Sequence, residues 1–554
     1  MAPSTTQLAP TREEIDRRPA DQAARGPRLK IDGDIERAPC ALDEPAYADI
    51  KVTVTDAQFH SLEGVTPEEL RSSYAALLGA DRPISTLCTI RDAAATMLRR
   101  KGYLAAVQVP TQRIENGIVR FEVLYAKIVA VRVRGDAGKS EKLLASYLGR
   151  LTRDKVFNRY NAERYLLLAR DLPGMDVRLA LKPAGTNAGE LVGEVSVIRT
   201  PFDADFGIQN YAARTTGRWS GMLGAHAYGL LGQGDRLSGS VSSTADFKAQ
   251  QIVQAGYDMK LGSDGLAVGG NVTYAWTAPA IPVTPGSPSL HLKARTLFAT
   301  ASVSYPFIRS QALTLLGSAG MDFLNQSVTV PGTTINRDHL RVGFLRLDID
   351  AADIAEERLP NWRAFGSIEF RQGLDILNAS PRGKIALPTT SRLNGDPTSS
   401  VIRASGSFEL RLGKSIWIAF LPRAQYAFTQ LLSFEQYSGG NYTVGRGYDP
   451  GSIIGDSGIG SGVELRLNRF TPFPKTNLSI QPFLFGDGAW VWDKVGGGDD
   501  HLYSLGGGVH ALFNNRFRLD ATVAVPMRKV GTQTQRSDPR ILISFSTKLW
   551  PWGN

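Results

Sequence analysis

Cysteine is scarce in this sequence, which contains only Cys40 and Cys88 among its 554 residues. Neither residue lies in a C-x-x-C spacing or beside a histidine cluster, so the pair does not indicate a redox or metal site. Two interpretations stay open, namely one structural disulfide or two inert thiols. A disulfide would indicate an oxidising compartment for this part of the chain.

Long apolar runs are also absent, and no uninterrupted run reaches the length of about 18 residues that a membrane-spanning helix needs. This excludes a bundle of transmembrane helices. It does not exclude a transmembrane β-barrel, because alternating lipid-facing and lumen-facing residues give such a barrel an average hydropathy like that of a soluble protein. The N-terminus, MAPSTTQLAPTREEIDRRP, lacks the apolar core of a secretory signal. The chain is therefore either cytoplasmic or has lost a signal.

No charge pattern or catalytic motif points to nucleic acid or to an enzyme. Lys and Arg number 63 against 53 Asp and Glu, but the excess is spread along the chain and forms no basic stripe. The sequence has no G-x-S-x-G, H-E-x-x-H or phosphate-loop motif. We therefore expect no catalytic residue, no metal and no cofactor. The histidines, none of them in a nucleophile motif, are His60, His226, His291, His339, His501 and His510.

The chain is too long for a single ordinary domain, and its first 200 residues alternate helix and strand. The order strand, helix, helix, strand, strand occurs twice, with a period of about 75 residues. Two small copies in tandem favour a recognition arm, and the alternative is two unrelated α+β modules. The first copy is expected at 50–55, 66–78, 89–101, 104–109 and 118–123, and the second at 128–134, 140–148, 161–169, 177–181 and 191–198.

After Thr200 the helical periodicity gives way to two-residue alternation, as in ATASVSY at 299–305 and IRASGSFELRL at 402–412. Clusters of Gly, Asn, Asp or Pro separate about sixteen such segments. This spacing is typical of a large up-and-down barrel with about 16 antiparallel strands.

One polar, glycine-rich segment at 429–458 is too long for a hairpin turn and must either stand in solvent or fold back inside a barrel. Its centre is Arg446, between Gly445 and Gly447. An arginine inside a barrel needs a carboxylate, because an unpaired charge away from bulk water is costly. We expect this partner to be Asp487, in FLFGDGAW. The alternative is a solvated Arg446, with Asp487 paired elsewhere.

Several motifs resemble the two-partner secretion transporters (TpsB family, type Vb secretion), which join POTRA domains to a 16-stranded outer-membrane barrel. The resemblance spans nearly the whole chain. It includes GYLAAVQVPTQRIENG, DLPGMDVRLALKP, LGQGDRL, SYPFIRS and the long loop with its tip VGRGY. The matching positions in the two POTRA-like repeats are Tyr103, Pro110, Gln112, Gly117, Pro173 and Gly174.

At the loop, Arg446, Gly447 and Tyr448 match the family's R-G-Y tip, although Gly445 stands where valine is usual. Phe485 and Asp487 match the strand motif that accepts the tip arginine. The resemblance implies that Arg446 pairs with Asp487 inside the barrel, near its periplasmic end.

The resemblance also implies a domain plan and a function. Residues 1–49 would be a plug helix and linker, 50–126 the first POTRA domain, 127–200 the second, and 201–554 the transmembrane barrel. A capping box at Thr11–Glu14 and a short helix to Arg18 fit the plug, and its single apolar residue, Ile15, suits a water-filled lumen.

The expected function is recognition and secretion of an unfolded β-helical exoprotein across the outer membrane of a Gram-negative bacterium. The exoprotein would be an adhesin, a cytolysin or a contact-dependent toxin. We expect a monomer in contact with outer-membrane lipids, with its POTRA domains in the periplasm. The rival functions are an outer-membrane assembly insertase, which usually carries more POTRA domains, and a diffusion porin, which would need no arm.

Overall fold

The computed structural model describes residues 10–15, 39–187, 189–281, 290–353, 360–383, 385–473, 476–496, 498–531 and 536–551. The chain divides into two compact units. One comprises Gly26–Arg199 and Gly262–Asp264, and the other comprises Met1–Arg25, Thr200–Leu261 and Gly265–Asn554. Within the described ranges, no helix is long and apolar enough to cross a membrane.

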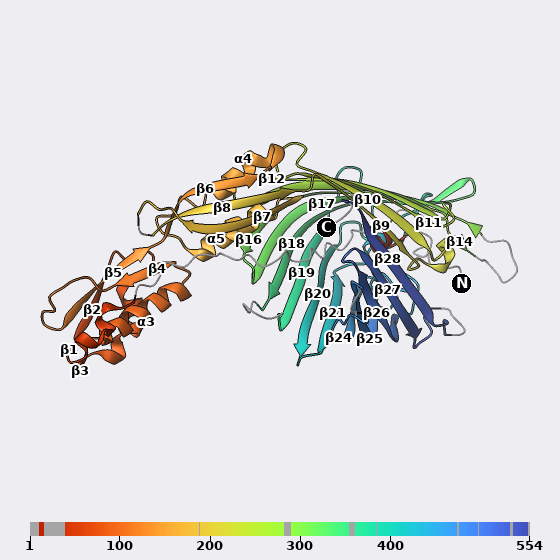
Figure 1. Ribbon diagram of the computed structural model, residues 1–554. Helices are drawn as coiled ribbons and strands as arrows, with labels where there is room; N and C mark the ends of the chain where they lie inside the picture. Colours follow the sequence, from red (N-terminus) through yellow and green to blue (C-terminus); the bar gives the residue numbers. More distant parts are fainter. Residues whose placement is uncertain are drawn as a thin grey trace. The chain divides into compact units, whose positions relative to one another are not determined.

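The smaller unit contains two copies of one α+β arrangement, which confirms the predicted repeat (Figure 1). In each copy a three-stranded sheet has the order first, third, second strand: β2-β5-β4 and then β6-β8-β7. The first strand is parallel to the central one, and the second is antiparallel to it. Helices cover one face of each sheet and enclose separate apolar cores. The elements are β2 Asp56–His60, α2 Pro67–Leu70, α3 Thr86–Arg100, β4 Ala105–Gln108, β5 Ile118–Tyr125, β6 Lys127–Gly135, α4 Glu141–Leu148, α5 Arg159–Arg170, β7 Met175–Pro183 and β8 Glu190–Arg199.

Local differences from the expected elements lie in the first copy. The strand expected at 50–55 is the short β1 (Lys51–Thr53), which pairs with β3 (Asp81–Pro83) outside the main sheet. Thr66 caps α2 through a capping box with Glu69, and a hydrogen bond from Lys101 lowers the pKa of that carboxyl. The helix nevertheless ends at Leu70 instead of about Leu78.

After Leu70 the chain turns more tightly than an α-helix. The hydroxyl of Ser73 donates to the carbonyl of Leu70 at 2.6 Å, and Tyr74 N donates to the carbonyl of Arg71, three residues back, at 3.2 Å. Two 3₁₀ turns follow, at Arg71–Ser73 and Ala75–Leu77. The second helix, α3, begins at Thr86, three residues before the expected start. Thr89, the expected first residue, therefore lies inside its first turn.

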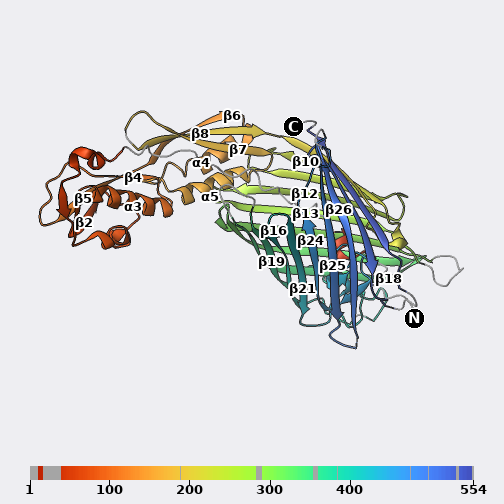
Figure 2. The same cartoon turned by 60° about the horizontal axis from the view of Figure 1, so that its bottom comes forward.

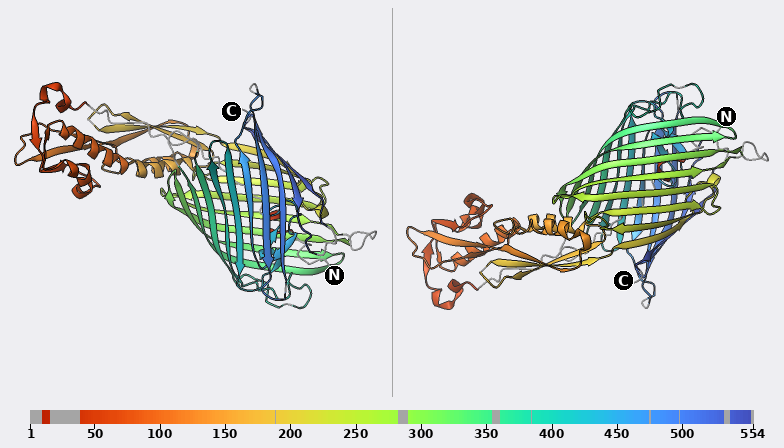
Figure 3. Two further views of the ribbon diagram at one scale, coloured as in Figure 1. Left: turned by 90° about the horizontal axis from the view of Figure 1, so that it is seen from below. Right: turned by 90° about the horizontal axis from the view of Figure 1, so that it is seen from above.

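The larger unit is a closed antiparallel barrel of 16 strands, as predicted (Figure 3). The strands follow one another in chain order, and the last pairs with the first. They are β9 Phe202–Gln209, β10 Ser220–Tyr228, β11 Arg236–Thr244, β12 Gln250–Leu261, β13 Leu266–Thr277, β16 Lys293–Arg309, β17 Leu313–Val330, β18 Thr333–Ala352, β19 Trp362–Gly373, β20 Ser400–Leu412, β21 Ile416–Ala427, β24 Ser457–Leu467, β25 Leu478–Trp492, β26 Asp499–Phe513, β27 Phe517–Pro526 and β28 Arg540–Trp550. A separate two-stranded ladder, β14 (Ala280–Ile281) and β15 (Leu290–His291), lies between β13 and β16.

Side chains alternate across the barrel wall. Outward positions carry exposed apolar residues, such as Leu345, Leu484 and Ile541, which are 62–65% exposed. Inward positions carry polar residues, such as Asp487 and Ser504, which are buried. An apolar outer surface around a polar interior is the arrangement of a transmembrane barrel.

Candidate functional site

The connection between β21 and β24 folds back into the barrel instead of standing in solvent. It contains a 3₁₀ turn, Ser433–Glu435, and a small hairpin of β22 (Tyr437–Gly439) and β23 (Ile453–Gly455). Tyr437 and Tyr448 are 2% and 1% exposed. They pack in a cluster with wall residues such as Val491 and Leu502. A loop in solvent would leave these side chains exposed, so the segment is an inward loop.

The tip arginine of this inward loop is bound to the barrel wall. Arg446 donates from Nε to Oδ2 of Asp487 at 3.1 Å and from Nη2 to Oδ1 at 2.9 Å, and its backbone N–H also donates to Oδ2 at 3.0 Å. Its guanidinium lies 3.8 Å from the ring centroid of Phe485. The structure thus brings together the three residues that the sequence singled out. A forked arginine–carboxylate pair fixes orientation as well as position.

The residues on either side of Arg446 leave no room for larger side chains. Gly445 has φ +119°, and a Cβ there would lie 2.5 Å from Leu502 Cδ1. Only glycine tolerates both conditions, which gives a physical reason for glycine where the related tips usually carry valine. The hydroxyl oxygen of Tyr448 lies 2.9 Å from the carbonyl oxygens of both Tyr503 and Arg528, to which its one hydrogen can donate, and it accepts from Arg528 N at 3.0 Å.

The height of the tip in the barrel differs from what the resemblance implied. Asp487 faces Gly462 in the β24–β25 ladder, which runs from Ser457–Trp492 at one end to Arg466–Phe483 at the other. The Arg446–Asp487 pair therefore lies midway along this ladder, not near the periplasmic end.

Sequence reasoning missed a second acceptor of the tip. Glu464, on β24, accepts from Arg446 Nη1 at 2.7 Å and also from Arg466 Nε at 2.6 Å. Its side chain is 7% exposed. The available signal was the alternation in GVELRL, which places Glu464 and Arg466 on the inward face of one strand.

A second buried charge cluster, also missed, lies around Arg371 on the barrel wall. Arg371 on β19 is 1% exposed and donates to Asp322, Glu369 and Glu435 at 2.8–3.0 Å. Glu435 belongs to the inward loop and also pairs with Arg403 of β20 at 2.9 Å. The cluster therefore ties the base of the inward loop to three strands of the wall.

The N-terminal segment lies in the same unit as the barrel, and its short helix α1 (Arg12–Ile15) is within the barrel in Figure 2. The expected capping box is present: Thr11 N donates to Glu14 at 2.8 Å, and Glu14 N donates to the Thr11 hydroxyl at 3.3 Å. Residues 16–18 of the expected helix lie outside the described residues. Ile15, the one apolar residue of this helix, is fully buried in an apolar cluster formed with residues of the barrel strands and the inward loop.

The POTRA-like positions stabilise turns and a sheet edge in the smaller unit. Gln112 forms two hydrogen bonds with the backbone of Arg120, at 2.7 and 2.8 Å, and one with the carbonyl of Pro110 at 3.3 Å. Tyr103 donates to the carbonyl of Gly64 at 3.3 Å and packs edge-on against Tyr125.

The matched glycines lie in tight turns. Gly117 has φ +73° and closes the turn before β5. Pro173 and Gly174, which has φ +70°, form the turn before β7. These matched positions therefore have structural contacts within the repeats.

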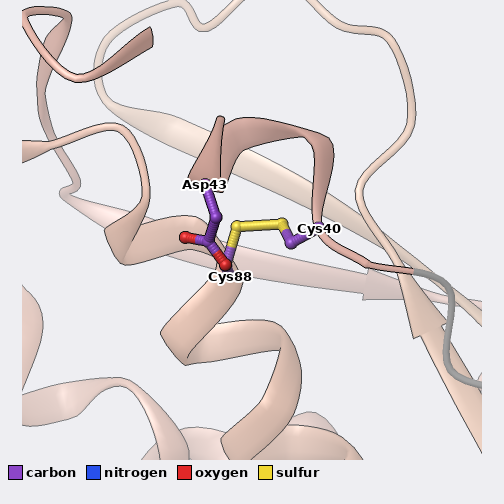
Figure 4. Close-up of side chains that lie close together, drawn as sticks. All are labelled: Cys40, Asp43 and Cys88. Atoms are coloured by element: carbon purple, nitrogen blue, oxygen red, sulfur yellow. A yellow bond between two sulfur atoms is a disulfide. The ribbon is translucent and has the colours of Figure 1, made fainter. Parts of the chain in front are cut away.

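Cys40 and Cys88 form a disulfide, with Asp43 beside it (Figure 4). It links the segment before β1 to α3, with Cα atoms 6.0 Å apart. Because both sulfurs are bonded to each other, neither is a thiolate that could bind a metal ion, and Asp43 alone does not make a site. In the described parts of the chain, no other three His, Cys, Asp or Glu side chains lie close enough together to share a metal ion.

A closed barrel with an apolar outer surface and an inward loop, preceded by two α+β repeats, is the architecture of a class of outer-membrane barrel proteins. The family model of the haemolysin secretion/activation proteins ShlB/FhaC/HecB matches residues 195–511. The chain therefore belongs to this family of two-partner secretion transporters, and its barrel implies a location in the outer membrane.

Solved structures share the fold. CdiB from Escherichia coli has 16% identity and a TM-score of 0.74, covering 93% of each chain. CdiB from Acinetobacter baumannii has 18% identity and a TM-score of 0.65, covering 93% of this chain and 91% of that one. A BamA from Haemophilus ducreyi lacking POTRA domains 1–3 has 13% identity and a TM-score of 0.52, covering 90% of this chain and 100% of that one. A search of curated proteins gave no match.

Proposed function

We propose that this protein recognises one particular large exoprotein in the periplasm, through its POTRA-like repeats, and secretes it unfolded through the barrel. The family match supports two-partner secretion. The inward loop lies inside the barrel, which supports a barrel interior that rearranges during transport. The partner is of the TpsA type. It is an adhesin, a cytolysin or a contact-dependent toxin.

The arm supports capture through its sheet edges. β2 and β4 are the outer strands of the first sheet, and β6 and β7 those of the second. An outer strand offers unpaired backbone groups that an extended peptide can bind with little dependence on side chains. Val129 and Val133 on β6 are 40% and 45% exposed, so this edge also offers apolar contacts that can select a partner.

The proposed domain plan follows from these roles. Residues 1–49 form the plug and linker, 50–126 and 127–200 the two POTRA domains in the periplasm, and 201–554 the barrel. No ATP is available in the periplasm, so transport is passive. Folding of the exoprotein outside the cell prevents its return and drives the net movement.

The single observation that carries the proposal is the inward loop, held through Arg446 inside a barrel of this family. The test is secretion of a large exoprotein, where one is encoded beside the gene, in cells with wild type, Arg446→Ala or no copy. We expect secretion with wild type, none without a copy, and at least a tenfold decrease with Arg446→Ala while the barrel still inserts. Unchanged secretion with depletion of other outer-membrane proteins would instead support an insertase.

A further inference from the structure

The short helix α1 is held in two ways, by polar contacts of Glu13 and by burial of the apolar side chain of Ile15. Glu13 pairs with Arg423 of β21 and accepts from the Ser438 hydroxyl of the inward loop at 3.0 Å. Its carboxylate thus has both a cation and a hydroxyl donor. Two residues further on, Ile15 is 0% exposed.

The side chain of Ile15 fills an apolar pocket made by both the wall and the inward loop. Its backbone carbonyl accepts from Gln254 Nε2 at 3.2 Å. A one-turn helix has almost no stability of its own, so these contacts, and not helix formation, hold the segment. The pocket residues are Ile252, Ala275, Phe298, Leu324, Leu340, Val342, Leu432 and Phe434.

The two charged residues of α1 are held in different ways. Arg12 approaches Asp322 at 3.4 Å and Glu435 at 3.8 Å. Both acids already pair with Arg371 at 2.8–3.0 Å. Departure of Arg12 therefore leaves no carboxylate without a cation.

Arg423 is different, because Glu13 is the carboxylate it pairs with, and no other acid pairs with it within the described residues. Its side chain is 31% exposed even with Glu13 in place. Once α1 leaves, the guanidinium of Arg423 and the hydroxyl of Ser438 lose the carboxylate that they share, and the apolar pocket loses Ile15. A partly hydrated arginine beside a hydroxyl binds a carboxylate readily and reversibly.

We propose that Arg423, Ser438 and the apolar pocket form a binding site for acidic segments of the polypeptide in transit, and that Glu13–Ile15 is its resident competitor. The site takes a carboxylate followed two residues later by a large aliphatic side chain. This inference rests on the proposed function and adds a ligand class to the barrel interior. Plug and exoprotein compete for one site, so arrival of the exoprotein favours the open barrel.

The direct test uses a synthetic peptide of residues 10–15, PTREEI, and its analogue PTRQEI, with purified full-length protein in planar bilayers. Glu13→Gln is expected to increase the fraction of open channels and therefore the conductance of the bilayer. PTREEI should then block that conductance at a concentration at least tenfold lower than PTRQEI does. In Glu13→Gln/Arg423→Gln the two peptides should block equally and weakly.

Matched variants keep the result interpretable. Arg423→Lys retains the charge and should keep the preference for PTREEI within about threefold. Arg236→Gln in the Glu13→Gln background removes a different arginine, on β11, which pairs with Asp258 at 2.9 Å, and should leave the preference unchanged. Equal block by both peptides in the Glu13→Gln protein, or a preference that survives Arg423→Gln, would overturn the proposal.

Measuring secretion distinguishes a binding site for the exoprotein from a latch, meaning a contact that only holds α1 in the barrel. Glu13→Gln and Arg423→Gln break the same ion pair, so a pure latch predicts equal secretion by both. A site for the passing chain predicts at least threefold less secretion from Arg423→Gln, and equal secretion would count against it. If wild type secretes nothing, the proposed function fails, while the peptide measurement still decides the binding site.

Discussion

Asp487 is the residue on which the position of the inward loop depends most. It accepts three hydrogen bonds from Arg446, including one from the backbone, and its side chain is 3% exposed. Glu464 accepts one, and shares its charge with Arg466. The two acids are therefore not equivalent partners.

Asp487→Asn should destabilise the barrel by about 3 kcal/mol, because it leaves a largely buried guanidinium with only a shared carboxylate. The measurement is thermal unfolding in detergent. Glu464→Gln is the matched control and should cost less than half as much, since the forked pair remains. If Glu464→Gln costs as much as Asp487→Asn, the forked pair is not the main anchor.

The sequence allowed prediction of Arg446 and Asp487 because each stands in a local pattern: an arginine between glycines, and an acid in an apolar strand. Glu464 is also an acid in an alternating strand, GVELRL, but that pattern does not say which cation it binds, and Arg371 has no comparable signal. Their roles depend on contacts between strands and with the inward loop, since Glu464 lies on the strand next to that of Asp487 and Arg371 reaches Glu435 of the loop. Arg371 lies 64 residues from Glu435 and 49 from Asp322, and no local signal encodes that closeness.

At the scale of elements, a side-chain amide lengthens the junction between the first and last strands. Asn210, just after β9, donates from Nδ2 to the Ile541 carbonyl at 2.8 Å and accepts from Ile543 N at 2.7 Å. Its own backbone N–H donates to the Ile543 carbonyl at 3.1 Å. The side-chain amide of Gln112 likewise binds the backbone of Arg120 in β5. In both units, therefore, a side-chain amide makes the pair of hydrogen bonds that a neighbouring strand would make.

Asn210→Ala should lower the free energy of unfolding by about 2 kcal/mol, since two backbone groups of β28 lose partners. Thermal unfolding of the detergent-solubilised barrel measures this. Asn271→Ala is the matched control, because Asn271 of β13 has no side-chain hydrogen bond among the described residues. An equal effect of both changes would mean that the amide does not join the strands.

Elements were predicted best where one periodicity extends over many residues. The second POTRA-like repeat has such patterns, and its elements lie within two residues of the expected bounds. In the barrel, the expected segments 299–305 and 402–412 lie inside the longer strands β16 and β20. The expected helix at 66–78 was wrong beyond Leu70, where two 3₁₀ turns, Arg71–Ser73 and Ala75–Leu77, take its place. Periodicity alone does not distinguish such turns from a continuing α-helix.

At the scale of the whole molecule, the two rims of the barrel have connections of unequal length. Connections at the rim where β9 begins include the short turns 262–265, 310–312, 413–415 and 514–516. The opposite rim carries the long connections 374–399 and 428–456. Outer-membrane barrels have short periplasmic turns and longer extracellular loops. The rim at which the POTRA-like repeats join the barrel is therefore expected to face the periplasm.

Cysteine labelling tests this orientation cleanly, because the two native cysteines are joined in the disulfide and leave no free thiol in the chain. Lys414 lies exposed in the turn 413–415. Arg382, with a side chain 68% exposed, lies in the connection 374–399. A membrane-impermeant maleimide should label Arg382→Cys on intact cells, and Lys414→Cys only after the outer membrane is permeabilised. Wild type should stay unlabelled in both conditions. The reverse labelling pattern would mean that the barrel has the opposite orientation in the membrane. An exoprotein would then have to enter from the other rim.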